Sequence, residues 1–579
     1  MKNEQNLMNQ RHSLSHLLAA AVLEIYPDAK VTLGPPIDNG FYYDFKFSSP
    51  VSNDDLGKIQ KKMLELLPKW TEFTSKEVSA DEAREFFVGN EFKTELINEI
   101  EKTGEKITLY TCGGFADLCK GGHIENLSSI DKKSFELSKV AGAYWRGDEK
   151  NPMLTRIYGL AFETESDLAD YKKQIEEAGL RDHRKIGKEL DLFTFSELVG
   201  AGLPLFTPKG AALRNAVVDK IYAIQSKYDY KEVWIPHITK PDLYKVSGHW
   251  DKYGDELFKV QGIESEFVLK PMNCPHHTQI YSSSPKSYRD LPVRFVEATT
   301  NYRDEQTGEL LGLSRVRSLT QDDGHIFCTP EQIEQEISQI VDIIKTFYTQ
   351  LGMFDESKYW VRLSIRDSKT PEKYLGEDSI WNHSEEILKQ ICEKENLNYK
   401  TGEGEAAFYG PKLDFMFKDA IGREWQLATI QLDFNMPKRF ELEYTDKDGT
   451  RKNPVMIHRA IAGSLERFLS VMIEHFAGNF PLWMSPIQVS VITINEAHNE
   501  YGKEVVDALK KEGFRVEFEN SDEGFGKKVR KAKTDKTPYF VIIGDAEVES
   551  KTLTLESRDA GKIGSVTLED LIEKLKSEN

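Results

Sequence analysis

The sequence predicts an α+β protein of several domains, because the chain is long, its composition is that of a folded protein, and a polar helical segment separates two different patterns. The chain has 579 residues, of which 39% are hydrophobic, 11% aromatic and 30% charged. At about 100–200 residues per domain, this length indicates about three or four domains. The hydrophobic and aromatic content is well above that of disordered chains, so we expect most of the chain to fold.

Residues 1–163 combine helical and strand-like patterns. Residues 40–45 read Gly-Phe-Tyr-Tyr-Asp-Phe and favour a strand. The run rich in Glu, Lys and Asp from Thr164 to Leu190 is interpreted as a connector helix, whose first part, 164–184, separates the domains. Before residue 40, four apolar side chains recur at helical spacing, namely Leu14, Leu17, Leu18 and Val22. We therefore expect an α+β domain before the connector.

Residues 185–481 form the largest expected domain. A helix is predicted from about Ala211, after a segment whose Gly and Pro residues favour turns. Aromatic-rich strands are predicted at 293–299 and 422–434.

Residues 482–579 alternate strands and helices. Apolar runs at 487–492, 516–518 and 539–543 are separated by helical segments, one of them basic. This alternation favours a small α/β domain with a largely parallel sheet.

Charge and cysteine usage exclude several classes of protein. Lys and Arg total 76 against 95 Asp and Glu, a formal net charge of −19, so the whole protein is not a cationic nucleic-acid binder. Any contact with nucleic acid must come from local basic patches. Five scattered cysteines and an opening stretch without an apolar core indicate a reduced, cytoplasmic protein. No run approaches the ~20 apolar residues that span a bilayer, so no membrane insertion is expected.

Two segments of the central domain have features of a phosphate site. Arg303 and Glu305 precede a glycine-containing turn, and Arg315 returns on an expected second strand. The planar fork of Arg matches phosphate geometry, although an ordinary charged hairpin explains the pattern equally well. The mostly small residues at 460–464 mark a passage from strand to helix, with Arg467 one turn into the helix. Such residues let a ligand approach the backbone at a helix N-terminus.

These segments, together with Val-Trp-Ile-Pro at 233–236 after a long amphipathic helix, resemble in order motifs 2, 3 and 1 of class II aminoacyl-tRNA synthetases. Finer matches resemble the threonyl-tRNA synthetase family, over essentially the whole chain from Arg11 onward. They are Lys-Pro-Met-Asn-Cys-Pro at 270–275, Thr-Gln-Asp-Asp-Gly-His-Ile-Phe at 320–327, Phe-Tyr-Gly-Pro-Lys at 408–412 and Val-Met-Ile-His-Arg at 455–459. The small ubiquitin-like amino-terminal domain common in bacterial members is missing, so the resemblance is to a short form.

The resemblance implies a fold and an activity. It implies an α+β editing domain at 1–163, a class II antiparallel sheet with flanking helices at 185–481, and an α/β anticodon-binding domain at 482–579. It further implies a homodimer formed through motif 1. The implied activity is ATP-dependent activation of L-threonine and its transfer to tRNA(Thr), with hydrolytic editing of mischarged seryl-tRNA(Thr).

Two other functions share part of this pattern. A prolyl or seryl enzyme would carry the general motifs, but Cys274, His325 and His458 argue against it. A non-catalytic paralogue that binds tRNA or acts in regulation would be indicated by loss of motif arginines, yet Arg303 and Arg467 are present. Amino-acid-dependent pyrophosphate exchange separates the three functions.

Cys274, His325 and His458 are the expected metal ligands. They lie far apart in the sequence, and from spacing alone each would be a buried cysteine or a hydrogen-bonded core histidine. The resemblance implies that they bind one zinc ion per subunit, with a fourth position left for the amino and hydroxyl groups of threonine. A required hydroxyl would reject valine far more strongly than an apolar pocket does. His276 and His277, of which the first replaces the usual glycine, are expected at the surface.

The resemblance also assigns residues to adenylation and transfer. It implies that Arg303 bridges the threonine carboxylate and the α-phosphate, and that Glu305 contacts the adenine amino group. His249 would help to deprotonate the terminal ribose 2′-OH, with an ordinary pKa suited to that step. Leu319 replaces the usual phenylalanine against adenine, which predicts a higher KM for ATP. The remaining implied residues are Arg315 and Arg467 on the outer phosphates with Mg²⁺, Gln321, Asp323, Tyr409 and Lys412 around threonine and the phosphate, and Gln426, Gln431 and Ser464 along the nucleotide site.

The carboxy-terminal domain carries a basic run within 527–536, which on its own is equally typical of a solvated helix face. By resemblance this domain reads the anticodon, with Asp522, Glu547 and Arg558 as candidate contacts. Asp522 stands where the family has Asn, and Glu556 aligns with an expected Arg, so some base contacts are predicted to differ.

The amino-terminal domain carries two pairs of potential ligands. His12 and His16 are four residues apart, as are Cys119 and His123, so each pair is expected on one face of a helix. Such bare pairs occur in ordinary structures, and the four residues are also able to bind a second zinc or to line a pocket that activates water. The resemblance adds Lys93 and Asp117 and implies hydrolysis by a positioned water without a metal, with Gly122 in place of the usual proline.

Overall fold

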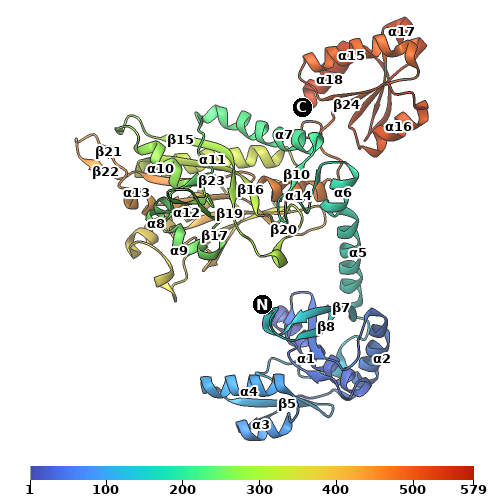
Figure 1. The fold of residues 1–579 in the computed structure, drawn as a ribbon, viewed down its shortest axis with the longest axis vertical. Coiled ribbons are helices and arrows are strands. Elements are labelled where there is room, and N and C mark those ends of the chain that lie inside the picture. Colours follow the sequence, from blue (N-terminus) through green and yellow to red (C-terminus); the bar gives the residue numbers. More distant parts are fainter. Residues whose placement is uncertain (1) are drawn as a thin grey trace. The chain divides into compact units, whose positions relative to one another are not determined.

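The computed structural model describes residues 2–579 (Figure 1). It divides into two compact units, Met1–Glu176 and Glu177–Asn579, and each is described by itself below. None of the helices in residues 2–579 combines the length and the apolar character that a bilayer crossing needs. The α+β multidomain fold class predicted from the sequence is confirmed.

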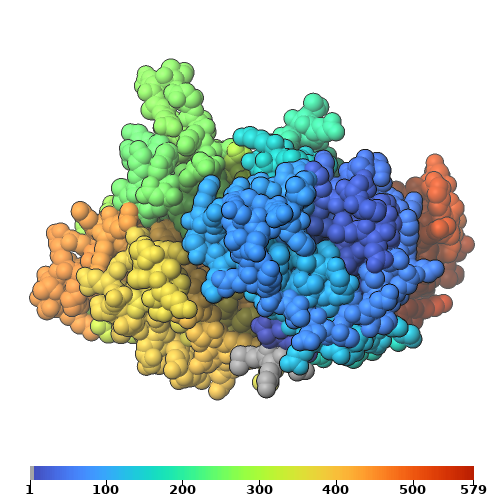
Figure 2. All heavy atoms as spheres, turned by 90° about the horizontal axis from the view of Figure 1, so that it is seen from below, coloured from blue at the N-terminus to red at the C-terminus, as the bar shows by residue number. Residues whose placement is uncertain are grey.

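The first unit, blue to cyan in Figures 1 and 2, is built around one long helix on an antiparallel sheet. The apolar stripe of α1 (Lys2–Ile25), which includes Leu14, Leu17 and Leu18, is fully buried, as its helical spacing predicts. The sheet has the order β1-β3-β8-β7, with β2 paired to β3. Its strands are β1 (Lys30–Val31), β2 (Pro36–Ile37), β3 (Gly40–Lys46), β7 (Phe135–Tyr144) and β8 (Met153–Ala161).

A smaller sheet with the order β4-β5-β6 completes the unit. Ser79 caps α3 together with Glu82, and Asn90 caps α4 by accepting a hydrogen bond from the backbone N–H of Lys93. This cap fixes the first turn of α4 and with it the position of Lys93. The elements are α2 (Leu56–Leu66), β4 (Thr74–Val78), α3 (Ala80–Phe86), α4 (Glu91–Thr103), β5 (Ile107–Cys112) and β6 (Phe115–Leu118).

The expected connector helix is two helices. α5 (Glu165–Arg181) ends where Asp182 leaves the helical conformation, and Asp182 then caps α6 (His183–Glu189) by accepting from the Arg184 N–H. An aspartate favours a helix start over a helix interior because its side chain competes for the backbone N–H groups.

The core of the second unit is an eight-stranded sheet with the order β11-β15-β16-β23-β20-β19-β17-β18. All its pairings are antiparallel except the outermost two, β11 with β15 and β17 with β18. The predicted strands at 293–299 and 422–434 correspond to β15 and β20. The bounds are β11 (Lys231–Glu232), β15 (Val293–Tyr302), β16 (Ser318–Cys328), β17 (Tyr359–Ile365), β18 (Tyr399–Glu403), β19 (Lys412–Lys418), β20 (Glu424–Asp433) and β23 (Val455–Ala460).

Helices cover this sheet and bury the largest apolar cluster of the protein. α7 (Pro208–Gln225), α11 (Ile333–Thr349), α12 (Asp378–Lys394) and α14 (Leu465–His475) contribute most of its helical side chains, and α6 adds Ile186. Shorter helices are α8 (Pro241–Ser247), α9 (His249–Tyr253), α10 (Cys274–Ser282) and α13 (Asn435–Arg439). Smaller sheets are formed by β9 (Phe193–Thr194) with β10 (Leu205–Phe206), by β12 (Ile238–Thr239), β14 (Glu266–Leu269) and β13 (Lys259–Gln261) in that order, and by β21 (Tyr444–Thr445) with β22 (Arg451–Lys452).

The last part of the chain forms a five-stranded sheet with the order β25-β24-β26-β27-β28. Only the first three strands are parallel, and β27 and β28 pair antiparallel, so the expected largely parallel sheet is half antiparallel. The short α17 between β26 and β27 does not form a parallel crossover, and a tight turn follows β27. The elements are β24 (Val489–Thr493), α15 (Asn499–Lys511), β25 (Val516–Glu519), α16 (Phe525–Thr534), β26 (Tyr539–Ile543), α17 (Asp545–Ser550), β27 (Leu553–Ser557), β28 (Gly561–Val566) and α18 (Leu568–Glu578).

Candidate functional site

One row of side chains crosses four neighbouring strands of the eight-stranded sheet. His325 on β16 lies opposite His458 on β23, His458 lies opposite Gln431 on β20, and Gln431 lies opposite Lys412 on β19. Directly opposite residues point to the same face of a sheet. Alternation along β16 adds Asp323 to this face. The strand register thus gathers residues that are far apart in the sequence.

Cys274 completes a buried group of potential metal ligands on this face. It is the first residue of α10, and the ligand atoms of Cys274, His325 and His458 all lie within 4.8 Å of one another. The Nε2 atom of His325 is 3.0 Å from Nδ1 of His458. The structure therefore brings together the three residues that the sequence analysis singled out as ligands.

The chemistry of this group fits a zinc ion. Burial raises the pKa of the Cys274 thiol well above its usual value and lowers that of His325 well below, so both are uncharged without a cation. The outward nitrogen of each histidine has a partner: Nε2 of His458 is 3.1 Å from Asp433 Oδ2, and Nδ1 of His325 is 2.8 Å from His277 Nδ1. Such outer contacts orient histidine ligands at metal sites. Three protein ligands of these types leave zinc one open position.

His276 and His277 are buried, so their expected place at the surface is wrong. His276 is 8% and His277 0% exposed. The first turn of α10, which carries Cys274, packs against the sheet, and both residues are carried inward with it. This burial is not predictable from local sequence, because it depends on how α10 packs.

Two residues that sequence reasoning missed support Asp323. The side-chain amide of Asn273 donates to Asp323 Oδ2 at 3.0 Å and accepts from Lys270 Nζ at 3.0 Å. Lys270 is fully buried, and burial lowers its pKa to about 8. Burial also raises the pKa of Asp323. The only signal was their place beside Cys274 in the sequence.

The other residues expected around the small substrate have contacts of their own. Tyr409 is buried with its ring centre 5.2 Å from that of His458. Gln321 accepts from Asn301 at 3.1 Å, and Gln431 donates to the Gly410 carbonyl at 3.3 Å.

Lys412 and Gln426 converge on one buried carboxylate. Lys412 Nζ is 2.6 Å from Asp414 Oδ2, and the Gln426 amide donates to Asp414 Oδ1 at 2.7 Å. Both functional groups are therefore engaged with Asp414 in this structure.

Three arginines gather beside the loop between β15 and β16. Burial lowers the pKa of Arg467, and the positive charges of Arg315 and Arg303 lower it further. Arg315 pairs with Glu305, with 2.8 Å from Nε to Oε2. Ser464, the N-cap of α14, has its backbone paired with that of Gln321 on β16. Such a cluster of cations at a helix N-terminus suits a polyanion.

His249 opens α9 and is almost completely buried. Its Nδ1 is 2.8 Å from the Ser247 hydroxyl, and its Nε2 is 3.7 Å from Cys274 Sγ. Burial, with His458 and Arg303 nearby, lowers its pKa to about 3. The expected ordinary pKa is therefore wrong, and His249 is neutral at physiological pH.

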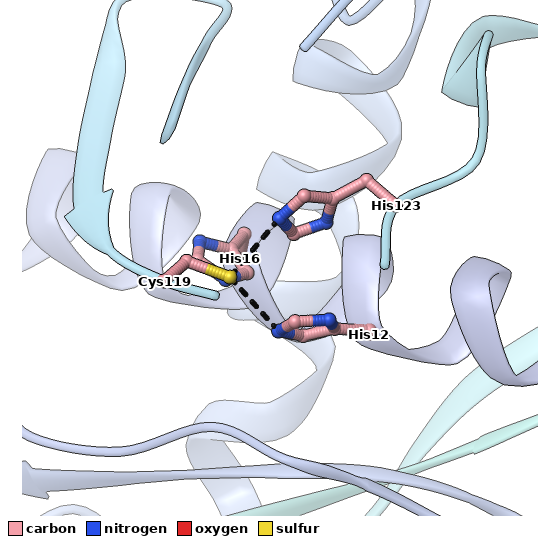
Figure 3. Close-up of side chains that lie close together, drawn as sticks. All are labelled: His12, His16, Cys119 and His123. Carbon is pink, nitrogen blue, oxygen red and sulfur yellow. Dashed lines mark hydrogen bonds between the residues drawn. The ribbon is translucent and has the colours of Figure 1, made fainter. Parts of the chain in front are cut away.

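A second cluster lies in the first unit, where Figure 3 shows Cys119 between two histidine rings. Cys119 Sγ is 3.5 Å from His12 Nε2 and 3.3 Å from His123 Nε2. His16 lies one turn after His12 on α1, and its ring centre is 4.8 Å from that of His123. Burial lowers the pKa of His123 to about 2 and raises that of Cys119 to about 11, so the thiol is protonated at neutral pH.

Cys119 and His123 do not share a helix face, which corrects the expectation from their spacing. They lie in the loop after β6, where Gly121 and Gly122 have φ of +95° and +85°. These left-handed positions turn the chain back so that His123 reaches α1.

A buried ion pair adjoins this cluster. Lys93 on α4 pairs with Asp117 on β6, and both side chains are almost fully buried. The hydroxyl of Tyr43, which sequence reasoning missed as a site residue, donates to Asp117 and is 3.4 Å from Lys93 Nζ. A cavity of about 430 Å³ is lined by His12, His16, Lys93, Asp117 and Cys119.

The expected anticodon residues make separate contacts. Glu547 accepts from the Gly544 N–H and from Thr554, and Arg558 donates to the backbone carbonyls of Phe480 and Lys536. Asp522 lies exposed before α16.

The lysines of α16 are partly engaged within the protein. Lys528 is buried and donates to Thr493 O at 3.0 Å, and Lys531 pairs with Glu517 and Glu519. The basic run is therefore not a uniformly exposed cationic face.

Three family models match the chain. They are the tRNA synthetase class II core domain for G, H, P, S and T at residues 258–476, the anticodon binding domain at 488–578, and the threonyl and alanyl tRNA synthetase second additional domain at 107–158. The antiparallel sheet and its site thus define a class II aminoacyl-tRNA synthetase.

Curated relatives identify the family within this class of synthetases. A "Threonine--tRNA ligase" of Thermosynechococcus vestitus is 47% identical over 99% of this chain and 95% of its own length, and one of Cytophaga hutchinsonii is 46% identical over 98% and 88%. The chain belongs to the threonine–tRNA ligase family. The resemblance found in the sequence is thereby confirmed, and the chain is an enzyme that joins threonine to tRNA with ATP and Mg²⁺.

Solved structures agree with this assignment. The RNA binding domain of a threonyl-tRNA synthetase from Cryptosporidium parvum has a TM-score of 0.65 and 39% identity, and covers 69% of this chain and 98% of its own. A Giardia lamblia prolyl-tRNA synthetase, 18% identical with a TM-score of 0.55, covers 70% of this chain and 80% of its own and shares the fold.

Proposed function

We propose that threonine is selected and activated on the sheet face that carries Cys274, His325 and His458, and that these residues hold one zinc ion per subunit. The observation that carries this proposal is the cross-strand row, which places two histidines beside Gln431 and Lys412 on one face. A zinc ion held there would supply Lewis-acid coordination for the amino and hydroxyl groups of threonine.

Asp323 orients the substrate in this proposal. It accepts a hydrogen bond from the threonine hydroxyl, while Asn273 occupies its other oxygen. Gln321 and Tyr409 flank the amino acid, and Lys412 exchanges its contact with Asp414 for the α-phosphate.

The arginine cluster holds the nucleotide. Arg303 bridges the threonine carboxylate and the α-phosphate, so that the attacking and accepting groups are aligned and their charge is neutralised. Arg315 and Arg467 bind the outer phosphates with Mg²⁺, and Glu305, released from Arg315, accepts from the adenine amino group. Gln426, Gln431 and Ser464 line the same nucleotide site.

Transfer to tRNA uses His249. Because its pKa is about 3, its imidazole is neutral and able to accept a proton from the ribose 2′-OH, although as a weaker base than a solvent-exposed histidine. Its hydrogen bond with Ser247 fixes the orientation of the ring.

The first unit removes serine from seryl-tRNA(Thr). His12, His16, Cys119 and His123 position a water in the cavity, and Lys93 and Asp117 hold the substrate. A protonated Cys119 thiol is a poor nucleophile, which supports hydrolysis by water. The four side chains also form a possible ligand set, but we propose that the site works without a metal.

We assign editing to 1–163, the connector to 164–184, catalysis to 185–481 and anticodon binding to 482–579, with Asp522, Glu547 and Arg558 as anticodon contacts. The enzyme forms a homodimer through motif 1. All five cysteines are free thiols, which supports a cytoplasmic location.

Pyrophosphate exchange tests the activation site. Purified enzyme with zinc and Mg²⁺ is expected to exchange pyrophosphate into ATP only when threonine or serine is added, and to charge tRNA(Thr). Absence of threonine-dependent exchange, or exchange driven by proline, would contradict the proposal.

A further inference from the structure

His183 is a buried histidine that belongs to neither site described above. It is the first residue of α6 and is 3% exposed. Its Nδ1 is 2.6 Å from Glu474 Oε1, and its Nε2 accepts from the Leu313 N–H at 3.0 Å. Because a backbone N–H only donates, Nε2 is the acceptor and the ring proton lies on Nδ1, toward Glu474.

Glu474 anchors this histidine from the end of α14. One of its oxygens also accepts from the His183 backbone N–H at 3.1 Å, and the other pairs with Arg423. Although burial opposes ionisation, the hydrogen bonds from His183 and Arg423 lower the pKa of Glu474. A charged carboxylate therefore holds the ring from one side, and the ring presents a fixed acceptor on the other.

Leu313 belongs to the loop that carries Arg315. The loop turns at Gly312, whose φ is +50°, and a Cβ there would lie 2.2 Å from His183 Nε2. The contact therefore requires glycine for both its conformation and its space. The Arg315 N–H donates to Leu311 O at 3.3 Å, which ties Arg315 to the same turn.

The next residue of the loop, Ser314, contacts α14 directly. Its hydroxyl is 2.9 Å from that of Ser470, and its carbonyl accepts from Arg467 Nε at 3.1 Å. The loop is thus fixed at two successive residues, with Arg315 following at once and Arg467 beside it.

We propose that His183 is a positioning residue for ATP binding, which fixes Leu313 so that Arg315 and Arg467 face one phosphate site. This inference rests on the proposed role of these two arginines. A histidine serves here because its two ring nitrogens offer a donor and an acceptor on nearly opposite sides, and together they span the distance from α14 to the loop.

Kinetics of threonine-dependent pyrophosphate exchange test this role in the full-length enzyme. His183→Ala is expected to raise the KM for ATP about tenfold, as expected for a lost buried hydrogen bond, with the KM for threonine within about twofold of wild type. His183→Gln, whose amide again offers a donor and an acceptor, is expected to recover part of the loss. Gly312→Ala is expected to raise the KM for ATP as well, because it displaces the ring.

His498 provides a matched control. It is another buried histidine between a carboxylate and a backbone N–H, with Nε2 2.9 Å from Asp545 and Nδ1 3.4 Å from the Asn495 nitrogen, but it lies in the five-stranded region. His498→Ala is expected to leave the KM for ATP unchanged.

An unchanged KM for ATP in His183→Ala, or equal increases for ATP and threonine, overturns the inference. If His183→Ala does not fold, His183→Gln and Gly312→Ala decide by the same readout. Arg315→Ala distinguishes a failure of the positioning role of His183 from a failure of the proposed phosphate role of Arg315. If it raises the KM for ATP and the His183 variants do not, only the inference fails, whereas if it has no effect in active enzyme, the proposed phosphate role itself fails.

Discussion

At the residue scale, the orientation of Asp323 depends on buried polar groups that hydrogen-bond to one another. Asn273 uses both ends of its amide, toward Lys270 and Asp323, and so holds the carboxylate in one orientation. Its loss would remove the amide donor of the buried Asp323 carboxylate and leave Lys270 with only its hydrogen bond to Thr299, which is costlier than the loss of an exposed hydrogen bond.

We therefore expect Asn273→Ala to raise the KM for threonine about tenfold while the KM for ATP stays near wild type. Pyrophosphate exchange at varied threonine and at varied ATP measures both constants. Asn273→Asp keeps the shape but places a second carboxylate beside Asp323, so it should not restore binding. Equal changes in the two constants would contradict a specific role at the threonine site.

Leu319 gives a second prediction at this scale. It lies partly buried on β16 opposite Asn301, where a phenylalanine would offer an aromatic surface to adenine. Leu319→Phe is expected to lower the KM for ATP by about fivefold, the value of one added aromatic contact. The exposed Ile563 on β28 provides the control, because Ile563→Phe adds a ring in the five-stranded sheet, outside the eight-stranded sheet that carries the nucleotide site, and should have no effect. An unchanged KM in Leu319→Phe would remove the stacking argument.

Residue identities were easier to predict than residue environments. The resemblance singled out Cys274, His325 and His458; the strand register places the two histidines opposite each other, and the start of α10 brings Cys274 beside them. The burial of His277 and the low pKa of His249 were not predictable, because both depend on how α9 and α10 pack on the sheet. Local sequence carries no information about that packing.

At the element scale, long and strongly periodic segments were predictable. The apolar stripe of α1 and the strand β3 appear where the pattern placed them. The spacing of Cys119 and His123 was misleading, because two glycines with positive φ form a loop whose ends are four residues apart, as on a helix. The break at Asp182 between α5 and α6 was missed because the prediction rested on the composition of the whole segment, and a single capping residue hardly changes that composition.

The helix α1 and the loop that returns to it give a pH prediction. Burial holds the pKa values of His16 and His123 below the value of an unfolded chain, near 6.5. As pH falls below about 6.5, the unfolded state binds protons that the folded state does not, so the free energy of unfolding decreases. The stability contribution is complete above pH 6.5 and is lost progressively as the pH falls from 6.5 toward about 2, the pKa of His123 in the folded state, by at most about 1.4 kcal/mol per pH unit for each group.

Urea unfolding of the full chain, read by pulsed hydrogen exchange of α1 peptides at one labelling pH, measures this effect. His123→Gln should flatten the dependence on pH, whereas a substitution of the exposed His383 should leave it unchanged. Stability of α1 that is constant between pH 7 and pH 5 would contradict the buried, neutral state of these rings.

At the scale of the whole molecule, we propose that the second unit selects the amino acid during activation and that the first unit hydrolyses seryl-tRNA(Thr). Serine retains the amino and hydroxyl groups of threonine, and the missing methyl contact is worth only ~1–3 kcal/mol, so activation alone cannot reject it. A hydrolytic site is therefore needed for serine but not for valine.

Because editing and activation are assigned to separate units, we expect substitutions that abolish one activity to leave the other intact. His16→Ala and Cys119→Ala are expected to abolish deacylation of seryl-tRNA(Thr) while threonine-dependent pyrophosphate exchange stays at the wild-type level. Cys112→Ala, at a buried thiol of the same unit, is the matched control and should retain deacylation. Retained hydrolysis in both site variants would remove this cluster from the proposed function.

We propose above all that Cys274, His325 and His458 select threonine through one bound zinc ion. Metal analysis of the purified enzyme, combined with pyrophosphate exchange on threonine and valine before and after chelation, tests it most directly. We expect one zinc per subunit, exchange with threonine and none with valine, loss of exchange when zinc is removed and recovery when zinc is returned. Full threonine-dependent exchange by metal-free enzyme, or exchange supported equally by valine, would contradict the claim.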